Sequence, residues 1–221
     1  MDVVSVSTVT QAMLDAGWAP PAVLALATTL AEAYTTPKRA YHDLRHVEEL
    51  LAWFAAVRDQ GPGWAHPSDV LAAVLFHDAV YVAGQADNEA RSAELAGSCI
   101  AQHGLPCDVL RVVALIEATA RHGAESPSLA HEATGEASDL LHFLDADMAI
   151  LGAEPERFDD YERAIAEEYR VVPEAAFRTG RGRFLTRLLA LPWLYQTEFF
   201  SSRLELAARS NLTRASAALN P

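Results

Sequence analysis

The sequence has little of what marks secreted, membrane-spanning or disulfide-stabilised proteins. Its two cysteines, Cys99 and Cys107, form no CxxC motif, so we expect reduced thiols in place of a disulfide framework. No apolar run approaches the ~18 residues of a membrane-spanning helix. The opening segment MDVVSVSTVT lacks the basic region that precedes the apolar part of a signal peptide. These absences predict a cytoplasmic protein that does not enter a membrane.

Positive charge is also scarce, since 17 lysines and arginines face 30 aspartates and glutamates, for a net charge of −13. A surface of this sign repels the phosphate backbone of DNA or RNA, so a nucleic acid polymer is not an expected partner. A small phosphorylated substrate is compatible with it, because a bound metal ion reverses the sign of the field locally.

Long stretches that alternate apolar and polar residues are absent, which argues against half-buried strands. Apolar residues instead recur at helical spacing, as in Val47, Leu50, Leu51 and Phe54 at i, i+3, i+4 and i+7. With 51% hydrophobic residues in 221 positions and no repeat or long linker, we expect a single all-α domain over residues 1–221. Helices are expected at 8–17, 20–34, 43–59, 69–78, 88–103, 106–121 and 137–150, from 155, from 173, and at 193–209.

Several residues predict where these helices begin. Ser68 and Asp87 are candidate N-caps, because their side-chain oxygens can accept from the first free amides of a helix. Pro106 is expected at the first position of its helix, where the missing N–H has no helical partner to lose. The polar segment 122–136 is expected to be a loop.

Histidines and carboxylates gather at three places along the chain. His42 and His46 are four residues apart, so we place both on one helical face, which the apolar residues that follow turn inward. His77 and Asp78 close a nearly uncharged helix, so an imidazole and a carboxylate arrive together at the end of a buried element.

The third place is another apolar helix, which carries Asp145 and Asp147. Buried charges of this kind have to be paired or bound to a metal. Imidazole nitrogen combined with carboxylate oxygen suits Mn, Fe, Zn, Co, Ni or Mg. The three clusters therefore predict a site for one or two divalent metal ions, which would lower the pKa of bound water from about 16 to about 7.

The order H…HD…D on successive helices resembles the HD superfamily of metal-dependent phosphohydrolases. Within it, YHDLRHVEEL at 41–50 resembles the YHNxxHAxDV signature of cyclic-nucleotide phosphodiesterases. The segments FHDAVY, DNEARSAELA, LDADMAILG, AIAEEYR and ARSNL are similar to a bacterial group of predicted HD phosphohydrolases, so the resemblance runs from about Tyr34 to Leu212. It implies a helical HD domain that binds divalent metal and hydrolyses a phosphoester of a small molecule, such as a nucleotide.

The resemblance also implies a role for each matching residue. His42 takes the place of the histidine that protonates the leaving group, and His46 that of a metal ligand. His77 and Asp78 match the HD pair that binds metal, with Asp78 able to bridge two ions and so to take part in catalysis. Asp147 matches the last ligand, in the tripeptide ADM where the family pattern reads ADL.

Other residues are weaker candidates. Asp43 stands where Asn is common in the signature, and Asp145 is expected to be a hydrogen-bond partner near the metal in place of a ligand. His122, in a TxxH element, is a candidate ligand of a second metal. Glu89 is a candidate for contact with a metal-bound water, and Arg39 for contact with a substrate phosphate. The alternatives are a surface position at a helix C-terminus for His122, an acid at a helix N-terminus for Glu89, and a solvated basic residue for Arg39.

We therefore expect a phosphohydrolase in which water attacks phosphorus and His42 protonates the departing oxygen. Two alternatives stay open. His122 leaves room for a di-iron oxygenase, in which additional histidines complete a redox-active pair of irons. A non-catalytic binding module would instead use the metal only to hold the fold or a ligand.

Overall fold

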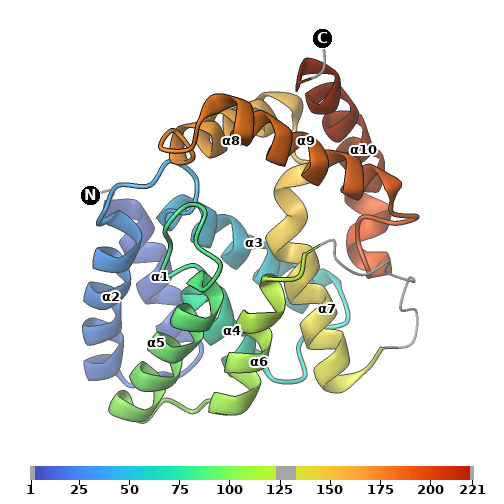
Figure 1. The fold of residues 1–221 in the computed structure, drawn as a ribbon. Coiled ribbons are helices and arrows are strands. Elements are labelled where there is room, and N and C mark those ends of the chain that lie inside the picture. The colour runs from blue at the N-terminus through green and yellow to red at the C-terminus, as the bar shows by residue number, and fades with distance from the viewer. Residues whose placement is uncertain (1–2, 123–132, 220–221) are drawn as a thin grey trace.

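The computed structural model describes residues 3–122 and 133–219, which form helices and no β-strand, as the all-α prediction requires. Figure 1 shows α1 to α6 packed as a lower bundle, α7 rising through the middle, and α8 to α10 gathered above as an upper group. In chain order the helices are α1 (Val3–Asp15), α2 (Pro20–Thr35), α3 (Leu44–Gln60), α4 (Pro67–Phe76), α5 (Asn88–His103), α6 (Val109–Thr119), α7 (Gly135–Asp147), the 3-10 helix η1 (Met148–Gly152), α8 (Pro155–Glu168), α9 (Glu174–Ala190) and α10 (Glu198–Leu219).

The centre of the lower bundle is α4. Every residue from Asp69 to Phe76 is buried, and α4 contacts α3, α5, α6 and α7. Its apolar sequence explains this position, because burying each Val, Leu or Phe side chain contributes about 1.5–3 kcal/mol. The one charged residue of that stretch, Asp69, accepts from the Asp108 amide at 2.8 Å and forms an ion pair with Arg111. The residues that follow α4 are therefore held at a defined place in the core.

The helix that joins the two parts is α7. Of the predicted loop 122–136, residues 123–132 lie outside the described residues, and α7 begins at Gly135. Its Phe143 packs in the hydrophobic core of the lower bundle, whereas Ala146, less than one turn later, packs in that of the upper group. The end of α7 therefore lies at the border between the two cores.

The last helix, α10, differs from the predicted range 193–209. The amides of residues 194–197 donate to the carboxylates of Asp145 and Glu205 at 2.8–3.3 Å. Because these amides have side-chain acceptors, the segment does not enter the helix, which begins at Glu198 and continues to Leu219.

The start of α3 also needs correction. His42 lies in a turn before the helix, and the expectation that it shares a helical face with His46 is wrong. The physical reason is the side chain of Asp43, which accepts from the amides of residues 45 and 46 at 2.9 and 3.4 Å and so caps the helix at Leu44.

Three other predicted helix starts differ in detail. Ser68 lies inside α4, which begins at Pro67. Asp87 makes no capping hydrogen bond to α5. Pro106 lies outside α6, because Asp108 caps that helix by accepting from the amides of residues 110 and 111 at 2.9 and 3.2 Å.

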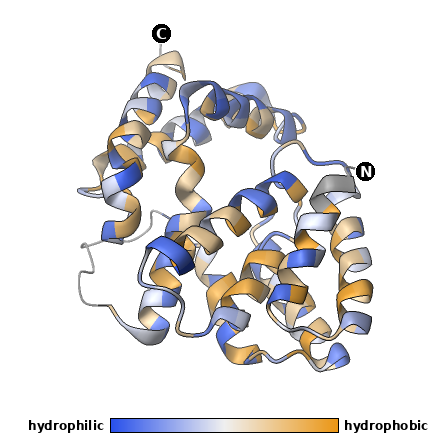
Figure 2. Ribbon diagram, turned by 180° about the vertical axis from the view of Figure 1, so that it is seen from behind, coloured by the Kyte–Doolittle hydropathy of each residue, from blue (hydrophilic) through white to orange (hydrophobic). Residues whose placement is uncertain are grey.

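The hydropathy of the helices differs between the two parts. Figure 2 shows many apolar residues in the lower bundle, whereas hydrophilic residues dominate α8, whose sequence is PERFDDYERAIAEE. Within the described ranges, no helix combines the length and the apolar character that crossing a bilayer demands.

Candidate metal centre and adjoining cavity

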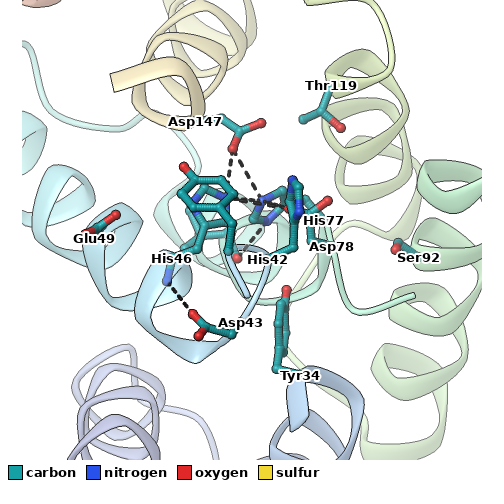
Figure 3. A network of polar contacts seen from close by, with 12 residues as sticks. Tyr34, His42, Asp43, His46, Glu49, His77, Asp78, Ser92, Thr119 and Asp147 are labelled. Carbon is teal, nitrogen blue, oxygen red and sulfur yellow. Dashed lines mark hydrogen bonds and ion pairs between the residues drawn. The ribbon is translucent and has the colours of Figure 1, made fainter. Parts of the chain in front are cut away.

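Side chains from three segments meet where α3, α4 and α7 come together (Figure 3). The His46 Nε2 atom, from the first turn of α3, lies 3.1 Å from His77 Nε2 and 3.1 Å from Asp147 Oδ1. His77 and Asp78 follow α4 directly, and His77 Nε2 lies 3.0 Å from Asp78 Oδ2 and 3.4 Å from Asp147 Oδ1. The structure thus brings together all four residues that the sequence predicts as metal ligands.

The geometry of these groups fits a divalent metal. His46, His77 and Asp78 each offer one ligand atom, and these atoms lie within 4.8 Å of one another. Ligand atoms that are about 2.1 Å from one ion lie about 3–3.5 Å apart, close to the separations found here. His77 Nδ1 lies 3.1 Å from the Val74 carbonyl, which can only accept, so Nδ1 carries a hydrogen and Nε2, the atom whose lone pair would bind a metal when the ring is neutral, faces the cluster. These residues could hold a metal ion, and its presence stays a prediction.

The cluster carries buried negative charge. Burial lowers the pKa of His77, but the carboxylates of Asp78 and Asp147 outweigh this effect and raise that pKa well above its ordinary value. Burial likewise raises the pKa of Asp78 and Asp147, and the neighbouring imidazoles bring both below the ordinary value. The two carboxylates are therefore anionic and need a compensating positive charge, which a protonated imidazole or a divalent cation can supply.

His122, just after α6, extends the cluster. Its Nε2 atom lies 2.7 Å from Oδ2 of Asp147, whereas the other carboxylate oxygen, Oδ1, contacts His46 and His77. Asp147 therefore lies between two groups of imidazoles, a position from which one carboxylate could contact two ions. Glu89, on α5, lines the cavity next to the cluster. A second metal ion at His122 stays a prediction.

Arg39 is buried beneath the site and contacts the backbone. Its Nη1 atom donates to the carbonyls of His42 at 3.0 Å and Asp78 at 2.6 Å, and its Nη2 atom to that of Ala79 at 2.9 Å. It therefore connects the turn before α3 to the segment after α4. Arg39 does not line the adjoining cavity, so its position does not support the predicted contact with a substrate phosphate.

His42 lines the same cavity as the cluster and is held there by Glu168, the last residue of α8. The His42 Nδ1 atom lies 2.6 Å from Glu168 Oε2, and Tyr81 stacks on the imidazole with ring centroids 4.0 Å apart. The other carboxylate oxygen, Oε1, accepts from the amides of residues 40–42 at 2.8–3.0 Å. Because a carboxylate only accepts, Nδ1 of His42 carries a hydrogen, which leaves Nε2 for proton transfer.

The same contacts favour a protonated His42. Burial lowers the pKa of His42, but the carboxylates of Asp78 and Glu168 raise it above the ordinary value. Burial raises the pKa of Glu168, whereas the hydrogen bonds from His42 and the backbone amides lower it to about 2. His42 is therefore an acid held by an ionised carboxylate beside the cluster.

The two aspartates of α7 have separate positions. Asp145 is 2% exposed and accepts from the amides of Gln196 and Thr197 and from the Thr197 hydroxyl at 2.7–3.0 Å. It therefore connects α7 to the segment before α10. Asp147, two residues later, belongs to the cluster, which agrees with the choice made from the ADL-like pattern.

A cavity of about 480 Å³ adjoins the cluster. Its volume lies within the range of about 300–1,000 Å³ that is usual for small-molecule sites. The Tyr41 hydroxyl in its wall is buried and has no hydrogen-bond partner among the described residues, so it is a free donor. Away from the cluster the wall is largely apolar and aromatic, formed by residues of η1, α8, α9 and the turn between α8 and α9: Met148, Ile150, Leu151, Tyr161, Ile165, Tyr169, Val172, Phe177 and Phe184.

Sequence reasoning did not identify Glu168, Tyr81 or Tyr41 as residues of the site. The signals were present, because Glu168 and Tyr81 lie in the AIAEEYR and FHDAVY segments that carry the resemblance, and Tyr41 directly precedes His42. Their roles depend on contacts between distant segments, which no local pattern reveals. Comparison of this chain with models of known families, with curated proteins and with solved structures returned no match.

Proposed function

We propose that this protein is a metal-dependent hydrolase of phosphoesters of small molecules, as its resemblance to HD phosphohydrolases implies. The observation that carries the proposal is the position of His42. This imidazole, held through Nδ1 by Glu168, lines one cavity together with His46, Asp78 and Asp147. An acid beside a site with metal-type ligands is the combination that ester hydrolysis requires.

A divalent cation held by the four predicted ligands would supply Lewis acidity, which makes hydroxide available near neutral pH and offsets phosphoryl charge. A side chain of the protein, His42, assists the departure of the leaving group. A water oxygen forms a new bond to phosphorus, the bond from phosphorus to the ester oxygen breaks, and His42 Nε2 gives its proton to that departing oxygen. The products are an alcohol and a phosphate, and a proton from the attacking water restores His42 through solvent.

The test is turnover of a panel of phosphomonoesters, including p-nitrophenyl phosphate, before and after metal removal and after addition of Mn²⁺, Zn²⁺ or Mg²⁺. Activity should require metal and should be lost in His46→Gln and His42→Gln. His103→Gln is the matched control, because His103 lies in the last turn of α5 and does not line the cavity. No turnover in any metal-loaded sample of the wild type contradicts the proposal.

One observation favours a second candidate, a di-iron oxygenase. His122 gives Asp147 an imidazole partner on its second oxygen, at 2.7 Å, so histidines lie on both sides of one carboxylate. Loading with iron and measuring O₂ consumption separates the two candidates. An oxygenase consumes O₂ with a bound pair of irons, whereas a hydrolase also works with redox-inert Mg²⁺ or Zn²⁺.

A further inference from the structure

One face of α9 lines the cavity with two small residues, Ala176 and Gly180, and two aromatic ones, Phe177 and Phe184. A side-chain carbon added at Gly180 would meet no atom within 4 Å, so the space beside this position is open. Gly180 is not among the glycines with positive φ, so the backbone does not require glycine there. Glycine inside a helix costs about 1 kcal/mol relative to alanine. What Gly180 provides is room in the cavity.

Away from the cluster the cavity offers little positive charge. Among the described residues that line it, Arg181 is the one arginine or lysine. Its guanidinium is ion-paired with Glu162 and lies over the rings of Tyr161 and Phe184, 5.1 and 4.8 Å from their centroids. A second phosphate group on a substrate would therefore meet no cation that lacks a partner among these residues, and burying such a charge without one is costly.

The rest of the wall favours a flat apolar group. Tyr169 and Phe177 lie in contact, with ring centroids 5.7 Å apart, and Ile165 and Val172 line the same space. Aromatic rings that pack against another ring gain about 0.5–1.5 kcal/mol beyond the burial of their area. Along this side of the cavity, a sugar or a glycerol group would instead place hydroxyls against Ile165, Val172 and Phe177, which cannot hydrogen-bond with them. Other parts of the chain contribute the polar lining residues Gln85, Asn88, Glu89 and Thr119.

We propose that the cavity selects a single phosphate esterified to a flat, largely apolar group, and that Gly180 sets the size of the group that it accepts. This inference rests on the proposed function for the reaction and deepens it by naming the class of substrate. The phosphate lies at the cluster, and the apolar group lies along α9.

Two phosphomonoesters test this selectivity, because 1-naphthyl phosphate carries a flat apolar group and glycerol 3-phosphate a small polar one. The wild type with metal should prefer the naphthyl ester in kcat/KM by about tenfold or more. Gly180→Leu should lower kcat/KM for the naphthyl ester by about 10–200-fold, as changes of this size in apolar pockets do, and that for glycerol 3-phosphate by less than about twofold.

Gly182→Leu is the matched control. Gly182 also lies in α9 with open space at the same distance, but it does not line the cavity, so both esters should be hydrolysed as by the wild type. Both substitutions replace glycine by a better helix former, so a loss confined to Gly180→Leu cannot come from unfolding of α9.

Binding of two phosphonates, which cannot be hydrolysed, separates this inference from the proposed function. Tighter binding of 1-naphthylphosphonate than of methylphosphonate by calorimetry, lost in Gly180→Leu and kept in Gly182→Leu, supports the inference even if no ester is turned over. Selective binding without turnover would contradict only the proposed hydrolysis and would leave the inference standing. Equal binding of the two phosphonates, equal losses in both variants, or tighter binding of a nucleoside triphosphate than of its monophosphate would overturn the inference.

Discussion

The two hydrophobic cores of this molecule are held to their surroundings in different ways. In the lower bundle, apolar packing dominates, and residues 70–76 of α4 are at most 1% exposed. Around the upper group, buried carboxylates accept from backbone amides of neighbouring segments. Glu168 of α8 accepts from residues 40–42, Asp145 of α7 from residues 196–197, and Glu205 of α10 from residues 194–195.

The two parts of the molecule supply different residues of the candidate site. The lower bundle and its border with α7 position the predicted ligands, whereas α8 and α9 of the upper group supply Glu168 and much of the apolar part of the cavity wall. Only Leu185 and Leu188 are buried in α9, in contrast to the continuous buried stretch of α4. If the proposed function is right, predicted ligands on a tightly packed scaffold next to a loosely packed wall would allow substrate size to change while the ligand geometry is kept.

The largest expected effect distinguishes His42, the proposed acid that the upper group holds, from the predicted metal ligands of the lower bundle. His42→Ala should lower kcat by about 10²–10⁴-fold, the usual contribution of a general acid, and should leave the bound metal per chain unchanged. His46→Ala should lose metal and activity together. Elemental analysis and kcat on the same preparations check both variants. If His42→Ala also released the metal, the assignment of His42 as the acid would be wrong.

Removal of metal should weaken the fold at the border between the two cores. A ligand that binds only the native state stabilises it by about 4 kcal/mol at a thousandfold excess over Kd. For a chain of this size that corresponds to about 10 °C in Tm. Asp78→Ala should reduce the shift. Thermal unfolding with and without a chelator, for wild type and Asp78→Ala, is the measurement, and identical curves in all four samples would mean that no metal binds there.

Removing Asp145, the α7 carboxylate that holds the segment before α10, should cost nearly as much as removing a leucine from the lower bundle. Asp145→Ala leaves the amides of Gln196 and Thr197 without their acceptor, and buried donors left in this way cost about 1–3 kcal/mol. We expect a loss of about 3 kcal/mol in the free energy of unfolding, against about 2–5 kcal/mol for Leu71→Ala.

Urea unfolding measures both losses. Asp160→Ala, at an exposed position in α8, is the control and should change the free energy of unfolding by less than about 0.5 kcal/mol. A loss as small as this in Asp145→Ala would show that apolar packing, and not this carboxylate, holds the segment before α10 to α7.

Local patterns predict the parts of this structure that depend on neighbours in the sequence. Apolar periodicity predicts the helices, and the all-α class is confirmed. A histidine or carboxylate at either end of a helix with an apolar face is carried toward the core with it, which is why His46, His77, Asp78 and Asp147 lie together. That the four bind metal stays a prediction.

Contacts between distant segments decide the rest. The i, i+4 spacing places His42 on the helix of His46, but the Asp43 cap starts that helix after His42. Glu168, 126 residues away, holds His42 in the preceding turn. The spacing of Asp145 and Asp147 does not tell which one faces the cluster, because the answer depends on the amides of residues 196 and 197. Neither partner is visible in a local pattern.

Glu168→Gln tests the contacts that connect α8 to the turn that carries His42. Because its pKa is lowered to about 2, ionised Glu168 stabilises the fold above its ordinary pKa of 4.5, and this contribution is lost as the pH falls toward 2. The raised pKa of His42 has the opposite sign: protonated His42 stabilises the fold below 6.5, and this contribution is lost as the pH rises through its folded-state pKa.

The difference in free energy of unfolding between wild type and Glu168→Gln should therefore be largest between pH 4.5 and 6.5, at about 2 kcal/mol, and should shrink on both sides. Urea unfolding with chelator at about pH 3, 5.5 and 9 measures it. A difference that does not vary with pH would show that the ion pair adds nothing to the backbone hydrogen bonds that an amide can also accept.

The smallest expected effect concerns how tightly the upper group is packed. A side-chain carbon at Gly182 would meet nothing within 4 Å, so Gly182→Ala should stabilise the protein by about 0.5–1 kcal/mol, or about 1–4 °C in Tm. Gly152, in η1, is the matched contrast, because a side-chain carbon there would lie 2.6 Å from Leu204 Cβ of α10, so Gly152→Ala should destabilise. Calorimetry on the wild type and both variants measures whether each substitution raises or lowers Tm.

Opposite changes in Tm would mean that the upper group is tightly packed where η1 meets α10 and loosely packed along α9. The side of the cavity formed by α9 would then be the part that can accept larger side chains. Destabilisation by Gly182→Ala would place α9 in tight packing as well and would remove the basis for a wall of adjustable size.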